Sequence, residues 1–496
     1  MFGLPLLATE SMMALGALAG LGVLVGLGEA LRARGVAAPT TRRIVHAGVS
    51  LFVASTPLLF MRPLAVYVLA ALFMVLNATA RSRRWWAGIH EARPHSWGTV
   101  ALPLSVLVAL GMTWSISPDR VYAFQGAYLV LALADPAASW VGEKATGATK
   151  ESPSATVSGS LAFAGLTLGL SGLVLRGSTV WPWADVLVAA VGATLVATSV
   201  EAICRQGWDN LFVPLALILL WSTFGQPTVD RELLSAALAA GLVFGGLAYG
   251  ADALNARGAV LGGLFATSLV GLGGVAWIVP GGVFFGLSSA LTFLHRDPHA
   301  PAAGAAPQRT SSQVLANGGV AWAAVVVGAV VPFGASGVAE ARYMVFVGAL
   351  AAAAADTWAT ELGMLSSSAP WSLRTGRKVP AGTSGAVSLA GTGAAVLGAA
   401  SVVGAAVLTN GPLTGVLWWD FGGLLGAGLL GAVADSIAGA FVQAQYRTDT
   451  GEWRETPPAP GASPVRGWAR VGNNIVNVVG TTVGGGAALV GFLLVA

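Results

Sequence analysis

The stretch YLVLALADPAASWVG, residues 128–142, indicates the fold class because it places an aspartate, Asp135, directly after a continuous apolar run. A second stretch, ADTWATELG at residues 355–363, repeats the pattern Ala-Asp-x-x-Ala-(Ser/Thr)-x-x-Gly around Asp356. Ionisable residues inside membrane segments are costly and usually functional. The repeated pattern therefore predicts membrane helices that carry a duplicated functional group.

Composition places the whole chain in the same class. Of 496 residues, 55% are hydrophobic and 10% are charged, whereas soluble domains carry about 25% charged residues. The sequence therefore predicts an all-α, polytopic integral membrane protein. The single cysteine, Cys204, excludes an intrachain disulfide. The first basic residue is Arg32, so we expect no ordinary cleavable signal peptide. A net charge of +4 gives no reason to expect a nucleic-acid partner.

Apolar runs of about 20 residues predict about sixteen membrane-spanning helices. Abundant glycine, 67 residues, would allow these helices to pack closely. We expect the spans near residues 12–31, 44–61, 63–80, 98–116, 121–141, 159–175, 183–204, 210–224, 232–250, 258–272, 275–294, 313–333, 342–363, 384–408, 416–443 and 473–495.

Basic residues are distributed unevenly between alternate loops. Of the 26 Lys and Arg residues, 21 lie in one set of loops, and the positive-inside rule assigns such loops to the cytoplasm. We therefore expect both termini outside, a bacterial inner-membrane location, and the Asp motifs at the cytoplasmic face. The basic set comprises residues 32–43, 81–97, 142–158, 205–209, 251–257, 295–312, 364–383 and 444–472.

The two halves of the chain share an order of polar features. Each Asp motif is followed by a basic loop, a Gly/Ser turn, a second acid (Glu201 or Asp435) and a segment that contains Asn. We interpret the chain as two diverged copies of one site. The first domain would span residues 1–225 and the second 257–496, with a connecting helix or linker at 226–256.

These residue types suit phosphoryl transfer. Carboxylate and amide oxygens bind Mg²⁺, which commonly bridges substrate phosphates. Basic side chains and the N–H groups of a Gly/Ser turn at a helix N-terminus bind phosphate. Phosphoryl transfer depends mainly on positioning and charge neutralisation. The sequence has no Walker motif, so a P-loop kinase is excluded.

The first half resembles the dolichol kinase and phytol kinase family over about residues 29–225. The resemblance rests on RRIVHAG (42–48), WGTVALP (97–103), DPAASWVG (135–142), GSLAF (159–163) and VEAICRQGWDNLFVP (200–214). It implies phosphorylation of an isoprenoid alcohol, typically with CTP. The family usually has Lys-(Ser/Thr)-x-Glu-Gly-Ser before its Gly/Ser turn, whereas Ala155 and Ser158 stand at the Lys and Glu positions here.

The second half resembles the phytyl-phosphate kinases over about residues 251–496. The matching motifs are RGA (257–259), SSALT (288–292), SSQVLANGG (311–319), ADTWATELG (355–363), VPAGTSGAVSLAGT (379–392), ADSIAGAFVQ (434–443) and NNIVN (473–477). The resemblance implies addition of a second phosphate to a prenyl monophosphate. Together the two resemblances imply a bifunctional fusion.

Roles for individual residues follow from the pattern and the resemblances together. Catalytic groups would be Asp135, Glu201, Asp209, Asp356 and Asp435, and Mg²⁺ ligands would be Asp135, Asp356, Glu361 and Asp435. Nucleotide and phosphate would be bound by Lys144, Lys150, Ser158, Gly159, Ser160, Asn210, Arg374, Arg377, Lys378, Gly382, Thr383, Ser384, Asn474 and Asn477. Arg43, His46, Gln313 and Asn317 would contact the isoprenoid substrate. Helix capping, interhelical hydrogen bonds and ordinary positive-inside charge are the alternative roles.

Three function classes are compatible with the sequence. The first is a membrane-embedded kinase that converts an isoprenoid alcohol to its monophosphate and then its diphosphate with CTP or another nucleoside triphosphate. The second is a CTP-dependent cytidylyltransferase that makes a CDP-lipid. The third is a transporter of lipid or ions, because internal repeats also occur in transporters. Polar residues gathered at one membrane face, rather than at the midplane, favour the enzymes. Chain length of the prenyl group and oligomeric state stay open.

Overall fold

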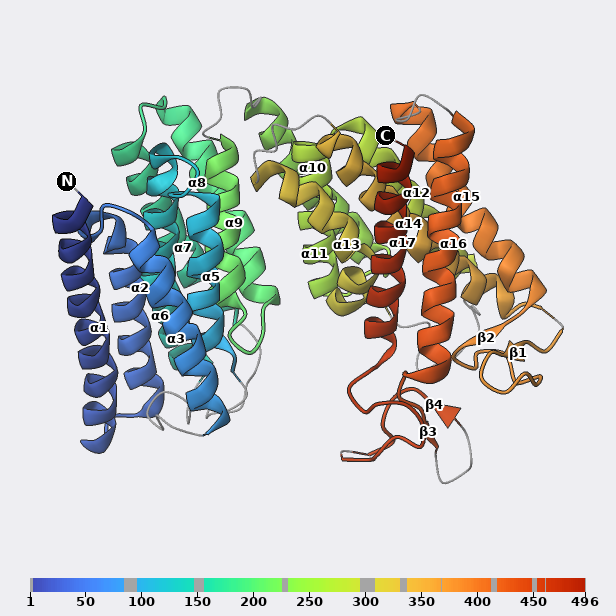
Figure 1. Cartoon of the computed structure of the whole chain (residues 1–496), viewed down its shortest axis with the longest axis horizontal. Helices are drawn as coiled ribbons and strands as arrows, with labels where there is room; N and C mark the ends of the chain where they lie inside the picture. The colour runs from blue at the N-terminus through green and yellow to red at the C-terminus, as the bar shows by residue number, and fades with distance from the viewer. Residues whose placement is uncertain are drawn as a thin grey trace. The chain divides into compact units, whose positions relative to one another are not determined.

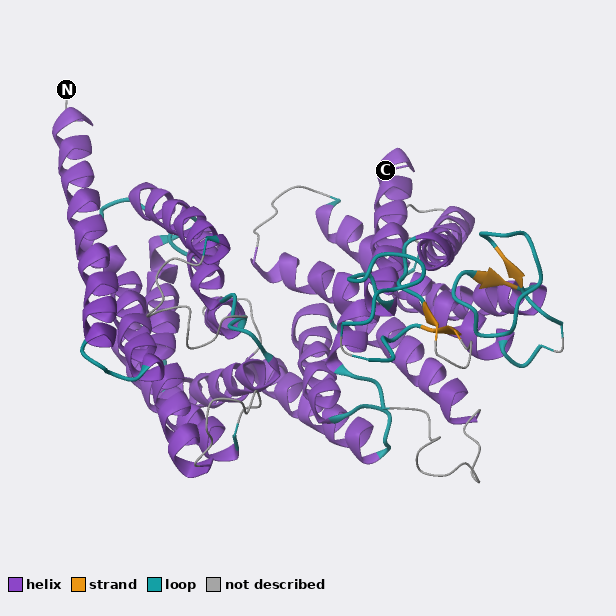
Figure 2. Cartoon of the chain, turned by 90° about the horizontal axis from the view of Figure 1, so that it is seen from below, coloured by secondary structure: helices purple, strands orange, loops and turns teal. Residues whose placement is uncertain are grey.

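A computed structural model describes residues 3–83, 96–146, 156–224, 231–294, 308–330, 337–366, 368–411, 417–447, 453–459 and 461–495. These parts of the chain are almost wholly helical, with two short β-hairpins (Figures 1 and 2). Thirteen of the described helices are long and apolar enough to span a membrane. The expected class, an all-α polytopic integral membrane protein, is confirmed.

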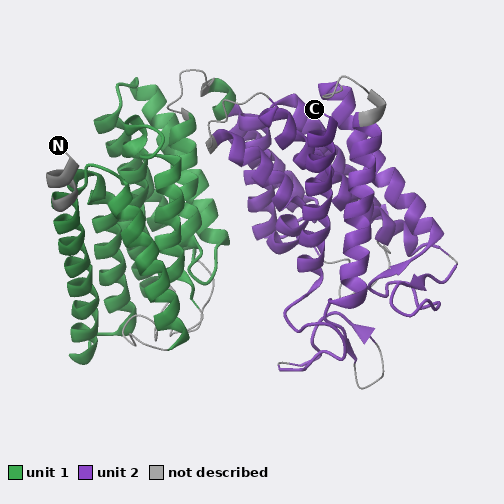
Figure 3. Cartoon of the chain, in the orientation of Figure 1, with its two compact units in different colours: residues 1–235 green, residues 236–496 purple. Residues whose placement is uncertain are grey.

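The chain divides into two compact units, residues 1–235 and 236–496 (Figure 3). The first unit contains α1 (Gly3–Ala33), α2 (Ala38–Leu59), α3 (Leu64–Ser82), α5 (Gly98–Met112), η1 (Pro118–Arg120), α6 (Val121–Thr146), α7 (Val157–Ser178), α8 (Trp183–Ile203) and α9 (Asp209–Phe224). The helix α10 (Arg231–Gly250) crosses the boundary. The second unit continues with α11 (Ala256–Ser268), η2 (Leu269–Gly273), α12 (Val275–Leu294), α13 (Ser311–Val330), α14 (Val338–Gly363), α15 (Leu389–Asn410), α16 (Leu417–Phe441) and α17 (Asn473–Val495).

Each of the sixteen expected spans coincides with a described helix. Three of these helices fall outside the thirteen spanning candidates: α5 and α9 are short, and α2 carries two arginines and a histidine in its first half. The span expected at 384–408 begins later than predicted. Residues 386–387 form a strand, and Ser388 caps α15, which begins at Leu389.

The expected connecting segment at 226–256 contains the helix α10, which packs against α11. A Cβ atom at Gly241 would lie 2.5 Å from the carbonyl oxygen of Gly263, so the two backbones touch. Most of α10 therefore belongs to the second unit and is not a free linker.

Among the thirteen spanning candidates, the helices that carry the two Asp motifs are the most buried of their units. In α14, almost every residue from Tyr343 to Ala355 is buried, and in α6 Phe124 and Tyr128 are fully buried. A helix that is apolar on all sides is expected at the centre of a bundle. The central helices therefore deliver Asp135 and Asp356 to the interior of each unit.

Four consecutive helices pack in the same order in both units. The helix α6 packs on α7 and α9, and α8 packs on α9; correspondingly α14 packs on α15 and α17, and α16 packs on α17. The caps correspond too. Thr156 Oγ1 accepts from Gly159 N at 3.1 Å, and Ser388 Oγ accepts from Gly391 N at 3.0 Å. The relation between the halves is therefore visible in packing as well as in sequence.

Two antiparallel hairpins belong to the loops of the second unit. Strand β1 (Trp371–Ser372) pairs with β2 (Ala386–Val387), and β3 (Tyr446–Arg447) pairs with β4 (Trp453–Arg454). Figure 1 shows β3 and β4 beside the end of α16 and the start of α17. The loop that carries β3 and β4 therefore lies at the end of the bundle where α16 ends and α17 begins.

Candidate functional site

In the second unit, four helices bring polar side chains together near one end of the bundle. Asp356 of α14, Asp435 of α16, Asn317 of α13 and Asn477 of α17 line one small hollow with Thr481. The first four lie within about two helical turns of the ends of their helices. The structure therefore brings together four residues that the sequence predicted to be functional.

Two oxygen atoms of this hollow have no hydrogen-bond partner in the described part of the chain. Asn477 Nδ2 donates to Asn317 Oδ1 at 2.8 Å, and the carboxyl groups of Asp356 and Asp435 meet within hydrogen-bonding range. Among the described residues, Asp435 Oδ2 and Asn477 Oδ1 are buried without a hydrogen-bond partner. Because buried polar atoms are normally partnered, these oxygens indicate a place for a ligand.

Glycines allow the three helices to approach this closely. A Cβ atom at Gly431 of α16 would lie 2.4 Å from Ala352 Cβ of α14 and 2.6 Å from the Gly480 carbonyl oxygen of α17. A Cβ atom at Gly480 would lie 3.1 Å from Asp435 Cβ. A larger side chain at either position would separate the helices that carry the two acids.

The donor set of the hollow suits a hard divalent cation. Within the described part of the chain, no group of three or more His, Cys, Asp or Glu residues has a metal-binding arrangement. Mg²⁺, however, is usually bound through one or two carboxylates, with water and substrate phosphates completing its shell. Asp356, Asp435 and the unpartnered oxygen of Asn477 fit such a shared site.

Glu361, the other expected metal ligand of this half, belongs to a different cluster. Its Oε1 accepts from the Thr292 hydroxyl at 2.8 Å, and Arg309 donates to the same hydroxyl at 3.3 Å. Burial lowers the pKa of the Arg309 guanidinium, and the Glu361 carboxylate opposes that shift. The structure therefore does not bring Glu361 together with Asp435.

Gln313, expected at the substrate, serves as a helix cap. Its Oε1 accepts from Thr310 N at 2.8 Å and from Thr310 Oγ1 at 3.2 Å. Gln313 N lies 3.4 Å from Thr310 Oγ1. This reciprocal arrangement is a capping box at the start of α13, so the substrate role of Gln313 is not supported.

The expected phosphate turn at Gly382, Thr383 and Ser384 packs against the end of α16. The Ser384 hydroxyl donates to Gln443 Oε1 at 2.7 Å, and the Thr383 hydroxyl donates to the Pro380 carbonyl. The turn ends before the helix N-terminus, which is at Ser388. The expected coincidence of turn and helix start is therefore wrong for this half.

The remaining polar residues expected in this half lie nearer the surface. Arg374, Arg377 and Lys378 are exposed in the β1–β2 hairpin, and Lys378 Nζ lies 5.9 Å from the ring centroid of Trp371. Asn474 is half-buried in the first turn of α17. The hairpin thus presents cations outside the bundle.

Glu455 is a third acid near the pair that sequence reasoning missed. The register of β3 and β4 pairs Tyr446 with Arg454, which places Glu455 beside the end of α16. Its carboxylate lies within electrostatic range of Asp356 and Asp435. The residue sits in an irregular segment, where no periodic pattern could have indicated its position.

In the first unit, the acid of the Asp motif meets a histidine. His46 Nε2 of α2 lies 3.3 Å from Asp135 Oδ2 of α6, although the angle is not that of a hydrogen bond. Arg42 and Asp209 lie within electrostatic range of His46, and Asp209 lies within range of Asp135. Two acids, a histidine and an arginine therefore form one cluster.

Arg43, expected at the substrate, points elsewhere. Its Nε donates to Ser139 Oγ at 3.2 Å, and its guanidinium pairs with Glu143. Because successive helical residues differ by about 100° around the axis, the preceding residue, Arg42, reaches the cavity instead. The structure therefore places Arg42 at the cavity and Arg43 at Ser139 and Glu143.

The other described residues expected in the first unit make separate contacts. Asn210 Nδ2 donates to the Gly98 carbonyl at 3.1 Å. The Ser160 hydroxyl donates to Glu201 Oε2 at 3.4 Å. Ser158, Gly159 and Ser160 form the first turn of α7, so the Gly/Ser turn lies at a helix N-terminus here.

Lys144 is exposed, with Nζ 4.0 Å from the ring centroid of Trp140. Lys150 and Ala155 lie outside the described residues.

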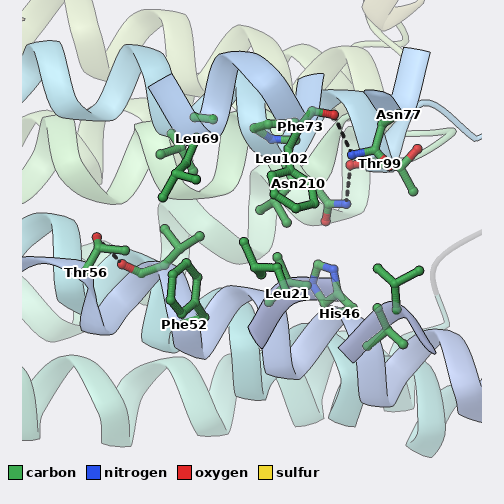
Figure 4. A pocket seen from close by; sticks show the side chains of 18 of the residues that line it. Leu21, His46, Phe52, Thr56, Leu69, Phe73, Asn77, Thr99, Leu102 and Asn210 are labelled. Atoms are coloured by element: carbon green, nitrogen blue, oxygen red, sulfur yellow. Dashed lines mark hydrogen bonds between the residues drawn. The ribbon is translucent and has the colours of Figure 1, made fainter. Parts of the chain in front are cut away.

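An apolar cavity of about 130 Å³ adjoins the first-unit cluster. Helices α1, α2, α3 and α5 and the start of α9 line it. Figure 4 shows His46, Asn77, Thr99 and Asn210 gathered toward one end, with Phe52, Thr56 and Leu69 toward the other. The cavity is thus polar at the acid cluster and apolar along the rest of its length.

Comparison with known proteins supports an integral membrane protein, and the names of the matching proteins state no reaction. Residues 239–485 match the family model described as integral membrane protein DUF92. An uncharacterized membrane protein of Methanocaldococcus jannaschii is 37% identical over 98 residues, 20% of this chain and 39% of that protein. Protein PGR of Arabidopsis thaliana is 32% identical over 190 residues, 35% of this chain and 65% of that protein. The chain thus spans less than two thirds of either relative. No solved structure matches.

Proposed function

We propose that the chain is a membrane-embedded, two-step kinase. The first unit would phosphorylate an isoprenoid alcohol, and the second would phosphorylate the resulting prenyl monophosphate to the diphosphate. CTP or another nucleoside triphosphate would supply both phosphoryl groups. The observation that carries the proposal is the apolar cavity that ends at Arg42, His46 and Asn210, beside Asp135 and Asp209.

In the first step, the hydroxyl oxygen of the alcohol would attack the γ-phosphorus. A bond forms between these atoms while the bond from the γ-phosphorus to the β–γ bridging oxygen breaks, and the nucleoside diphosphate leaves. The hydroxyl proton would pass to the carboxylate of Asp135 or Asp209. Arg42 would offset the negative charge that develops on the phosphoryl oxygens.

In the second step, an oxygen of the anionic prenyl monophosphate would attack the γ-phosphorus of a second nucleoside triphosphate. The bond from that phosphorus to the β–γ bridging oxygen would break, and the nucleoside diphosphate would leave. Mg²⁺, when bound, would neutralise part of the charge that two phosphorylated substrates bring together. Asp356, Asp435 and Asn477 are the residues that would hold it. The cations Arg374, Arg377 and Lys378 of the exposed hairpin would attract the nucleotide. The first unit would therefore act on a neutral acceptor, and the second on an anionic one.

An assay of products by mass tests the proposal. Purified full-length protein is mixed with geranylgeraniol, Mg²⁺ and each nucleoside triphosphate, and lipid products are analysed by mass spectrometry. We expect sequential gains of one and two phosphates. Asp135→Asn should stop the first step but still convert added monophosphate, whereas Asp356→Asn should accumulate monophosphate.

Matched acids away from the sites provide the controls for this assay. Asp185→Asn in the first unit and Asp252→Asn in the second should leave both steps intact. Loss of both steps in either site variant, with the protein still folded, would contradict one site per unit. A gain of CMP rather than phosphate would replace the kinase with a cytidylyltransferase.

A further inference from the structure

At the end of the first-unit cavity away from His46, here called the closed end, Thr56 and Val66 are 1% and 3% exposed. Val66 lines the cavity from the start of α3, whereas Asn77, near the other end of the same helix, lines it at the polar end. Figure 4 shows Phe52 and Thr56 of α2 at the end away from His46 and Asn77. The Thr56 hydroxyl donates to the Val53 carbonyl at 2.8 Å. Since the O–H donor of Thr56 is used within α2 and its neighbours Phe52 and Val66 are apolar, the closed end suits a hydrocarbon.

The length of the cavity follows from the helix that lines it. His46 and Thr56 both line the cavity and lie ten residues apart on α2, which corresponds to about 15 Å at 1.5 Å per residue. An extended isoprene unit adds four chain bonds of about 1.5 Å, or about 5 Å of length. The lining of the cavity is therefore about as long as three isoprene units.

The polar end indicates a neutral head group for the occupant. Asp135 and Asp209 both lie by His46, with Arg42 as the cation. A hydroxyl group can donate a hydrogen bond to either carboxylate, whereas the phosphodiester of a bilayer phospholipid has no proton to donate. An isoprenoid alcohol therefore fits both ends of the cavity.

We propose that Phe52, Thr56 and Val66 determine the chain length of the isoprenoid alcohol that the first unit accepts. This inference rests on the proposed function and adds the residues that set its specificity. A chain of up to about three isoprene units would lie wholly inside, whereas a longer chain would have to fold or leave its tail in the bilayer. Side chains at the closed end thus act as a steric stop.

Binding without nucleotide tests the stop independently of catalysis. Tritiated geraniol is bound to purified full-length protein in micelles and displaced by farnesol or geranylgeraniol. Val66→Phe should lower the affinity for farnesol and geranylgeraniol about tenfold or more relative to that for geraniol. A pocket that is shorter by one isoprene unit loses several methylene contacts with the longer chains. Val66→Ala should shift the preference toward the longer chains.

The control is Val68→Phe, which adds the same bulk to a position on α3 that is 61% exposed. Val68→Phe should leave the order of affinities unchanged. Equal chain-length profiles for Val66→Phe, Val66→Ala and the native protein would overturn the proposal, as would displacement of geraniol by phospholipid as effectively as by farnesol. A shifted binding profile without any phosphorylated product would uphold the steric stop and reject the kinase.

Discussion

Asn477 combines a structural contact with a free ligand atom. Its nitrogen donates to Asn317, which fixes the orientation of the amide, and its oxygen then faces no partner among the described residues. Asp435 presents a second unpartnered oxygen in the same hollow. This arrangement resembles the preorganised half of a metal shell, in which substrate phosphate and water would supply the rest.

Manganese binding should therefore depend on Asp435 and not on Glu361. Mn²⁺ is added to the full-length protein with a nucleotide, and bound Mn²⁺ is measured by electron paramagnetic resonance. Asp435→Asn should lower the affinity about tenfold or more, because one charged ligand is removed. Glu361→Gln should retain native affinity, since Glu361 is bonded to Thr292 near Arg309. A larger loss in Glu361→Gln than in Asp435→Asn would refute the assignment.

Some site residues were predictable from the sequence because their environment is unusual. An aspartate in an apolar helix is costly and therefore informative, which is why Asp135, Asp356 and Asp435 were found. Arg42 and Glu455 lie in or near loops, where charge is ordinary. The sequence does not show which side of its helix Arg42 occupies, or how the hairpin that precedes Glu455 is paired. The role of Gln313 was readable, since Thr310 and Gln313 have the spacing of a capping box.

Helices were predicted well because each apolar run has the length of a membrane span. The hairpins β1–β2 and β3–β4 were missed, since strands of two residues carry no alternation that could be recognised. The close packing of α14, α16 and α17 was foreseen only as a tendency of Gly-rich helices. Which glycines make contact depends on helix rotation, and composition does not contain that information.

Two glycines of α16 should therefore respond differently to the same substitution. Gly431→Val should reduce conversion of monophosphate about a hundredfold or more, because its side chain would meet Ala352 and the Gly480 backbone and displace Asp435. Gly426→Val should have little effect, since no atom lies within 4 Å of a Cβ there. Folding is followed by size-exclusion chromatography and circular dichroism. Similar losses in both variants would show that α16 tolerates no bulk at all.

At the scale of the whole molecule, the two units bring different acids together. In the second unit the acids of α14 and α16 meet directly, whereas in the first unit Asp135 of α6 meets His46 and Asp209. The corresponding acid of α8, Glu201, accepts from Ser160. The order of polar residues predicted two sites, but an order along the chain does not specify which acids meet. Helix packing decides that, and it differs between the units.

One peripheral helix has a consequence for substrate supply. Leu21 and Val25 of α1 line the first-unit cavity, whereas Met12 and Leu15 on the same helix are 73% and 67% exposed. The helix packs mainly on α2 and α3, so a single helix lies between the cavity and the acyl chains of the bilayer. An alcohol could then reach the enzyme by lateral diffusion without entering water.

The kinetics should consequently obey surface dilution. In vesicles with fixed amounts of protein and alcohol, added phospholipid lowers the mole fraction of alcohol in the bilayer and leaves its bulk concentration unchanged. The initial rate of monophosphate formation, measured with radiolabelled nucleotide, should fall in proportion to that mole fraction below saturation. A rate that followed the bulk concentration alone would instead indicate uptake from the aqueous phase. Supply in two dimensions would make the composition of the membrane, rather than the volume of the cell, the variable that sets the flux.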